Sequence, residues 1–81
     1  MPIEIKQLSL DLIDDPKIAM RTDIDDAELQ ELMASMRDVG LLQPIVVRPV
    51  ADRFEIIAGH RRTQAARLLD WTHIEAKIME A

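Results

Sequence analysis

The residues best suited to chemistry lie together at Gly59-His60-Arg61-Arg62, where an apolar segment gives way to a helical pattern. Glycine lets a backbone approach a ligand closely and adopts dihedrals closed to other residues. The first turn of a helix offers unpaired N–H groups and the positive end of the helix dipole. Two arginines at this end are repelled by the positive end of the helix dipole, and a bound polyanion would offset that repulsion. Guanidinium groups bind phosphate through paired hydrogen bonds. The turn is therefore a candidate phosphate site; alternatively, Arg61 and Arg62 are solvated or pair with acidic residues.

Other chemistries are less well supported by the residues. His60 and His73 are the two histidines, and their separation on different elements does not favour a shared metal ion. His60 could contact a phosphate, although a histidine at a helix start is more often a solvated polar residue. Carboxylates that could suggest Mg²⁺ cluster in one stretch: Asp23, Asp25, Asp26, Glu28 and Glu31. Helix capping and a solvated face explain most of them.

Composition and charge limit the classes of function. The chain has 81 residues, enough for one domain, 1–81, with a modest core, and no apolar run long enough to cross a membrane. Without cysteine, thiol catalysis, disulfides and cysteine-bound metals are excluded. The net charge is −5, with the acidic excess in residues 1–40. An acidic chain is a poor non-specific DNA binder, so the local gathering of Arg61, Arg62 and Arg67 better suits a compact anion site.

The elements that would position this turn can be inferred from residue patterns. Alternation over residues 3–7 predicts a half-buried strand, and Ser9 can cap a helical turn through Ile13. Asp14-Asp15-Pro16 breaks that turn, so residues 14–24 are expected to form an irregular loop that contains Arg21.

A helix is predicted at about residues 26–39. Asp25 is a suitable N-cap, and Gly40 stands where a left-handed C-terminal cap belongs. Leu29, Leu32, Met33 and Met36 fall on one apolar face, so the two methionines are expected to belong to the core.

The second half of the chain predicts strands at residues 45–48, 54–58 and 73–79, and a helix at about 60–69. Residues 49–53 are short enough for a hairpin connection, and Trp71 is expected to pack rather than to stack on a base. The result is an α+β fold: a small mixed sheet of about four strands with two main helices.

Three segments, in the same order and spacing, resemble the N-terminal domain of ParB-type partition proteins. Gly59-His60-Arg61-Arg62-Thr63-Gln64-Ala65-Ala66 resembles the family's G-E-R-R-x-R-A-A box. Residues 40–48, which read GLLQPIVVR, resemble its G-[ILV]-L-Q-P-[IL]-x-V-R segment. Arg21 stands at the arginine of its N-P-x-Q-P-R stretch. The resemblance covers nearly the whole chain and implies a ParB/sulfiredoxin fold.

The resemblance implies a nucleotide site. In that family the domain binds a nucleoside triphosphate, commonly CTP, sometimes with Mg²⁺. Carried over, Gly59, Arg61 and Arg62 would hold phosphates with help from Arg21, and Leu42-Gln43-Pro44 would lie near the base. Two residues depart from the box: His60 replaces Glu, removing a carboxylate close to the phosphates, and Gln64 replaces Arg. Sulfiredoxin's catalytic cysteine corresponds to His60, which excludes that activity.

Two functions follow as expectations. The first is a CTP-binding or other triphosphate-binding module of a partition or transcription-regulatory protein. Such a protein would act on DNA through a region absent from this chain. It would be cytoplasmic, located at the nucleoid or on a plasmid, and a homodimer is one possible arrangement. Any enzymatic activity would be at most weak hydrolysis of the triphosphate. The alternative is a small ATP-dependent phosphotransferase or nuclease on the same fold, although no general base is evident beside the phosphate turn.

Overall fold

The computed structural model describes residues 4–15, 26–41 and 43–80 of the chain. Its elements are β1 (Glu4–Ser9), the 3-10 helix η1 (Leu10–Leu12), β2 (Ile13–Asp14), α1 (Asp26–Val39), β3 (Ile45–Val50), β4 (Arg53–Ala58), α2 (His60–Leu68) and β5 (His73–Ile78). The predicted N-cap Asp25, together with Arg21 and Leu42, lies outside the described residues.

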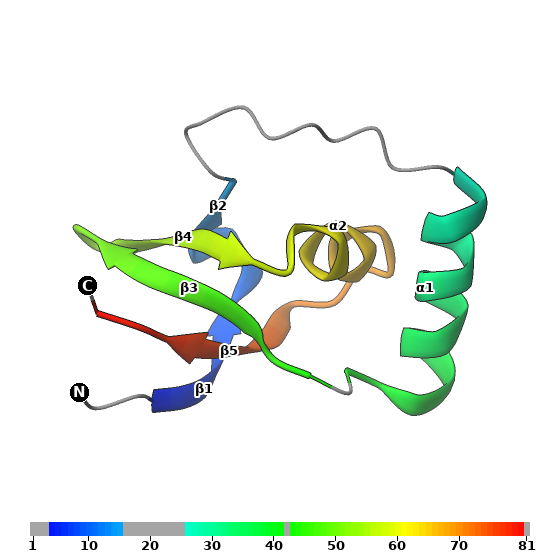
Figure 1. Ribbon diagram of the computed structural model, residues 1–81, viewed down its shortest axis with the longest axis horizontal. Helices are drawn as coiled ribbons and strands as arrows, with labels where there is room; N and C mark the ends of the chain where they lie inside the picture. The colour runs from blue at the N-terminus through cyan, green and yellow to red at the C-terminus, as the bar shows by residue number, and fades with distance from the viewer. Residues whose placement is uncertain (1–3, 16–25, 42, 81) are drawn as a thin grey trace.

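The strands form one mixed sheet in the order β1-β5-β3-β4-β2 (Figure 1). The pairs β1/β5 and β3/β4 are antiparallel, and the pairs β3/β5 and β2/β4 are parallel. Both outer strands come from the start of the chain, and the three inner strands come from its second half. The predicted α+β fold with a mixed sheet and two main helices is confirmed, with β2 as a fifth, two-residue strand.

Strand β2 lies where the sequence predicted the end of a helical turn and the start of a loop. The side chain of Ser9 does cap η1, accepting from the N–H of Asp11 at 3.3 Å, but the turn ends at Leu12. Ile13 instead pairs with Phe54 of β4 and is 2% exposed. The free backbone groups along β4 need partners, and a short parallel strand provides them while burying a β-branched side chain.

The interpretation of β1 as a half-buried alternating strand was wrong in its detail. Ile5 is 57% exposed, and the buried residue of the strand is Leu8. The register explains this, because Leu8 lies opposite the buried Ile74, whereas Ile5 lies opposite Lys77 on the other face of the sheet.

Helix α1 spans the predicted residues and buries the predicted face. Leu29, Met33 and Met36 are buried, and Leu32 is half-buried against the same cluster. Gly40 ends the helix with φ +77° and donates its N–H to the carbonyl of Met36 at 2.9 Å.

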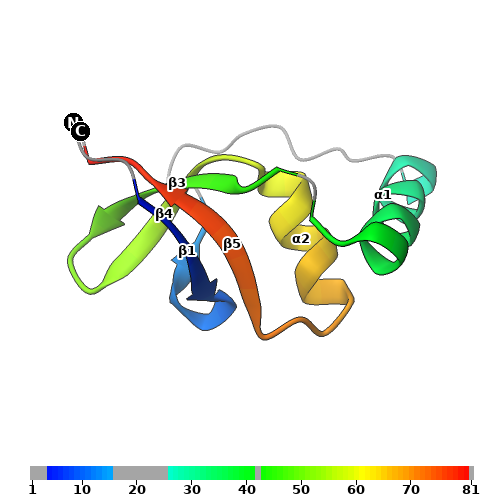
Figure 2. The same ribbon diagram turned by 90° about the horizontal axis from the view of Figure 1, so that it is seen from below.

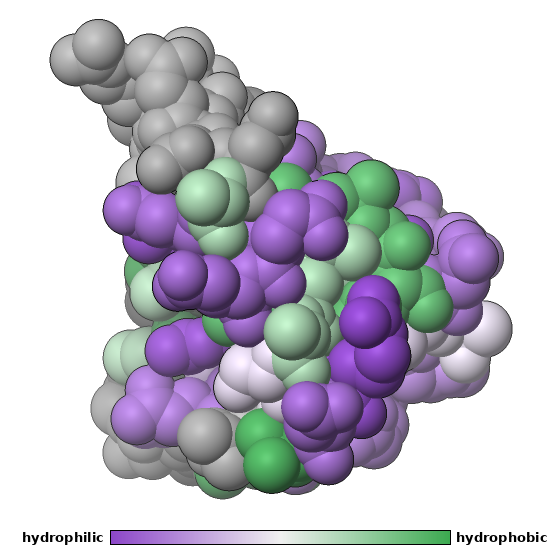
Figure 3. Space-filling model, turned by 90° about the vertical axis from the view of Figure 1, so that its right-hand side faces the viewer, coloured by the Kyte–Doolittle hydropathy of each residue, from purple (hydrophilic) through white to green (hydrophobic). Residues whose placement is uncertain are grey.

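The two helices form a layered arrangement with the sheet. Helix α2 lies between the sheet and α1 (Figures 1 and 2). The side of the molecule that carries α1 is a mosaic of hydrophilic and hydrophobic residues (Figure 3). Glu28 and Glu31 of α1 are both exposed. These two carboxylates therefore belong to a solvated face. In the part of the chain that the structure describes, no helix has the length and apolar character needed to span a membrane.

The core joins sheet and helices around the start of α2. Its buried members are Leu8, Leu10, Ile13, Leu29, Met33, Met36, Ile45, Val47, Ile56, Ala65, Ala66, Ile74, Ala76 and Ile78. Trp71 packs against this cluster and donates its backbone N–H to Ala66 at 3.0 Å, which supports a packing role. The β3–β4 hairpin turns at Ala51-Asp52, so β3 extends two residues beyond its predicted end.

Candidate anion-binding site

Gly59 connects β4 to α2 in a conformation that favours glycine. Its φ is +96°, as the sequence interpretation requires. A Cβ at this position would lie 2.7 Å from Cγ2 of Ile45, closer than real contacts allow. From the sequence we expected the backbone of Gly59 to approach a ligand closely. In the structure, this backbone closely approaches Ile45, the first residue of β3. Gly59 holds the end of β4 against β3 and so fixes where α2 begins.

Thr63, in the first turns of α2, stabilises this turn through two hydrogen bonds to Gly59. The residue is fully buried, and its hydroxyl donates to the carbonyl of Gly59 at 3.1 Å. The Thr63 N–H donates to the same carbonyl at 3.0 Å, which is the first α-helical bond of α2. The N–H groups of residues 60–62 precede that bond, and Gly59 supplies no side-chain cap for them. The sequence interpretation missed Thr63, although a hydroxyl four residues after a helix-starting glycine could have indicated it.

Two basic residues in the first turn of α2, His60 and Arg61, face carboxylates. His60 Nε2 lies 3.3 Å from Oδ1 of Asp15, and Arg61 lies 3.4 Å from Oε2 of Glu28. Both acidic partners come from the first half of the chain. For Arg61, the alternative of pairing with an acidic residue is therefore what the structure shows. His60, for which the sequence left a phosphate contact or a solvated position open, lies beside Asp15 with its side chain 20% exposed.

Arg67 does not join the anion site. Its Nη2 donates to the carbonyl of Ile13 at 2.7 Å, and its Nη1 lies 3.3 Å from Oδ1 of Asp15. These contacts tie α2 to the end of β2. Arg67 is therefore a structural residue, and the gathering of three arginines predicted from the sequence reduces to two.

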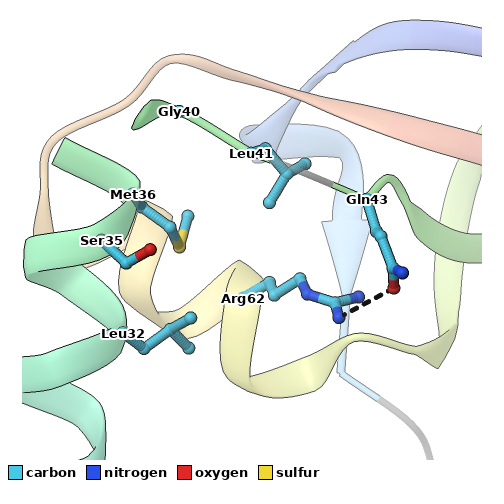
Figure 4. A pocket seen from close by; sticks show the side chains of 7 residues that line it. All are labelled: Leu32, Ser35, Met36, Gly40, Leu41, Gln43 and Arg62. Atoms are coloured by element: carbon cyan, nitrogen blue, oxygen red, sulfur yellow. Dashed lines mark hydrogen bonds between the residues drawn. The ribbon is translucent and has the colours of Figure 1, made fainter. Parts of the chain in front are cut away.

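Arg62 is placed differently from its neighbours. Its guanidinium Nη2 donates to the side-chain carbonyl of Gln43 at 3.2 Å, which is a neutral partner. Both residues line a pocket of about 300 Å³ between α1, the α1–β3 connection and α2 (Figure 4). The lining residues are Leu32, Ser35, Met36, Gly40, Leu41, Gln43 and Arg62.

The pocket brings together part of the predicted site. Arg62 and Gln43 meet at one side of it, while α1 supplies an apolar wall with the hydroxyl of Ser35 (Figure 4). Pro44 follows Gln43 but does not line the pocket. Arg21 lies outside the described residues. The sequence interpretation missed the contribution of α1, because the residues that build a core face and those that line a pocket share one periodicity.

The two histidines have separate environments. His60 contacts Asp15, whereas Nδ1 of His73 lies 3.0 Å from the hydroxyl of Thr72. Among residues 4–15, 26–41 and 43–80, no group of three or more His, Asp or Glu side chains is placed to hold a metal ion.

Comparison with solved structures identifies the fold. The chain superposes with a TM-score of 0.86 on the chromosome-partitioning protein ParB from Caulobacter crescentus, solved in complex with CTP-gamma-S. The match is 27% identical and covers 96% of this chain and 45% of that one. Sulfiredoxin from Arabidopsis thaliana gives a TM-score of 0.84 at 32% identity, covering 96% of this chain and 86% of that one. The ParB/sulfiredoxin fold expected from the sequence is confirmed.

Sequence comparison gives the family. A probable chromosome-partitioning protein ParB from Coxiella burnetii is 45% identical over 75 residues. That match covers 93% of this chain but 26% of the relative, so the chain spans about a quarter of its length. The family model of the ParB N-terminal domain matches residues 3–81. The chain therefore belongs to the ParB N-terminal domain family.

Proposed function

We propose that this domain binds a nucleoside triphosphate, with CTP as the first candidate. The phosphates would lie at the first turn of α2, on the guanidinium of Arg62 and the N–H groups of residues 60–62. The base would enter the adjoining pocket. The observation that carries the proposal is Arg62, an arginine in the third position of a helix that is bonded to a neutral amide at the rim of a pocket.

The chemistry of the site fits such a ligand. Helix N-termini bind phosphate through unpaired N–H groups and the helix dipole, and a guanidinium adds charge-assisted hydrogen bonds. The pocket volume of about 300 Å³ lies at the lower end of known ligand pockets. Its lining combines the apolar side chains of Leu32, Met36 and Leu41 with the hydroxyl of Ser35, a mixture suited to a flat heteroaromatic ring.

The relatives support the choice of nucleotide. The ParB structure from Caulobacter crescentus contains CTP-gamma-S. Arg21, the arginine matched by the family resemblance, would assist at the phosphates. Mg²⁺ would accompany the phosphates when bound, and any hydrolysis would be weak.

The domain would serve a partition-type protein as its nucleotide-responsive module. DNA binding would belong to regions outside this chain, with a homodimer as one arrangement of the protein. We propose this role from the relatives. The chain covers 26% of the ParB from Coxiella burnetii, so the relative contains regions that have no counterpart in this sequence.

Calorimetric titration with CTP, UTP, ATP and GTP, with and without Mg²⁺, tests the proposal. Arg62→Ala removes charge-assisted bonds of about 1.5–3 kcal/mol and should weaken binding roughly tenfold to a hundredfold. Arg48→Ala is the matched control, since it removes the same charge from an ion pair with Glu55 on the β3–β4 hairpin. Its affinity should equal that of the wild type. Binding that survives Arg62→Ala unchanged would place the ligand elsewhere.

A further inference from the structure

Gln43 links the α1–β3 connection to the first turn of α2. Its Oε1 accepts the 3.2 Å hydrogen bond from Nη2 of Arg62, across 19 residues of sequence (Figure 4). Figure 4 shows the two side chains extending toward each other along one side of the pocket. The contact therefore determines where the guanidinium of Arg62 stands.

The backbone that follows Gln43 is held in place. Pro44 restricts its own φ, and Ile45 is fully buried at the start of β3. Gln43 is thus an exposed side chain on an anchored segment, able to hold a partner in one place.

The neutrality of the Gln43 amide matters for an anion site. A carboxylate at this position would orient Arg62 but would also compete with phosphate for its charge, as Glu28 faces Arg61. An amide oxygen takes up one donor of a guanidinium that carries five, and leaves the full positive charge and the remaining donors for a ligand. A free arginine side chain would lose more rotamer entropy on binding than one already held.

We infer that Gln43 is a positioning residue that acts on the phosphates through Arg62 and does not read the base. This inference rests on the proposed phosphate site. It differs from the expectation that the segment around Gln43 lies near the base, and the two interpretations predict different behaviour toward a ligand without a base.

Inorganic tripolyphosphate provides that ligand. Calorimetric titrations with tripolyphosphate and with CTP would compare the wild type, Gln43→Ala and Gln43→Glu, each with Arg62 intact and in an Arg62→Ala background. Gln43→Ala should weaken both ligands by the same factor, about three- to tenfold, because the ligand itself must then order the Arg62 side chain. Gln43→Glu should weaken both further, because its carboxylate pairs with Arg62. In the Arg62→Ala background, Gln43→Ala should add no further loss.

Gln30→Ala, an exposed glutamine on α1, is the control and should bind both ligands like the wild type. Thermal melts of each variant would show that all are folded. A loss confined to CTP, with tripolyphosphate unaffected, would mean that Gln43 reads the base and would overturn the inference. An equal loss from Gln43→Ala in the Arg62→Ala background would overturn it as well. If wild type binds neither ligand, the proposed function itself fails, and this result is distinct from the other two.

Discussion

Gly59 and Gly40 allow the cost of a left-handed backbone to be separated from the cost of a steric clash. Both have positive φ, but a Cβ at Gly40 would have nothing within 4 Å, whereas one at Gly59 would meet Ile45 at 2.7 Å. Gly40→Ala should therefore lower the free energy of unfolding by about 1 kcal/mol, the backbone term alone. Gly59→Ala should add an overpacking cost of about 1–3 kcal/mol, because Ile45 is fully buried.

Urea denaturation of Gly40→Ala and Gly59→Ala measures the backbone cost and the overpacking cost as losses in the free energy of unfolding. Equal losses would show that β3 yields to the extra methyl group, and the packing role of Gly59 would be wrong. For the same reason a larger substitution at Gly59 cannot report on ligand binding alone, since it would also displace the sheet.

At the level of single residues, the sequence indicated the roles that depend on local conformation. The left-handed Gly59 and the helix that begins at His60 follow from residue type and order. The partners of the charged side chains could not be predicted, because they depend on which segments meet in three dimensions. Asp15 faces both His60 and Arg67 only because β2 adds to the edge of β4.

At the level of elements, one arginine of β4 adds side-chain contacts to the pairing of β2 with β4. Nε of Arg53 lies 2.8 Å from Oδ2 of Asp14, and its Nη2 lies 3.0 Å from Oδ1. Nη2 also donates to the carbonyl of Asp11 at 2.6 Å. Residues before and within β2 thus converge on a single side chain of β4.

This contact makes the stability of the pairing depend on pH. The hydrogen bonds from Arg53 lower the pKa of Asp14 below its ordinary value. A carboxyl whose pKa is lowered in the folded state adds stability above its unfolded pKa and loses it as pH falls through the folded value. Asp14→Asn should therefore lower Tm at neutral pH by a small amount, since the pair is exposed. The difference from wild type should begin to shrink near about pH 4, where the unfolded carboxyl starts to be protonated. It should disappear only once the pH has fallen through the lower pKa of the folded state.

Thermal melts followed by circular dichroism between pH 7 and pH 2 would measure this effect. Asp52→Asn, in the turn of the β3–β4 hairpin, serves as the control and should show no such convergence. A deficit of Asp14→Asn that stays constant across the range would contradict an ionic contribution.

The elements that could be predicted are those with a periodic pattern and local end signals. The helix α1 was predicted at its observed bounds, because its apolar face and Gly40 are both local features. The two residues of β2 are too few to carry a period, and only the free edge of β4 makes them a strand. The inward face of β1 was misjudged, since its register with β5 depends on residues about 70 positions away.

At the level of the whole molecule, charge argues against DNA binding by this domain alone. The net charge is −5, and Arg61 at the start of α2 faces the carboxylate of Glu28. We expect affinity for duplex DNA at physiological salt to be no tighter than the micromolar range of non-specific binding. Fluorescence anisotropy with a labelled duplex would measure this. Sub-micromolar binding that weakens steeply with added salt would contradict it and would require a cationic surface on the folded domain.

The strand order has a consequence for the timing of folding during synthesis. Strand β1, the first strand of this domain to be synthesised, pairs with β5, the last strand of the domain, with Glu4 opposite Ile78. Such non-local pairing is slow, because a loop must close before any contact compensates for its entropy. A nascent chain that has not yet released residues 73–78 lacks the strand that joins β1 to β3. Unfinished chains would therefore expose open strand edges to chaperones and proteases, and the domain would form only once its last strand is made.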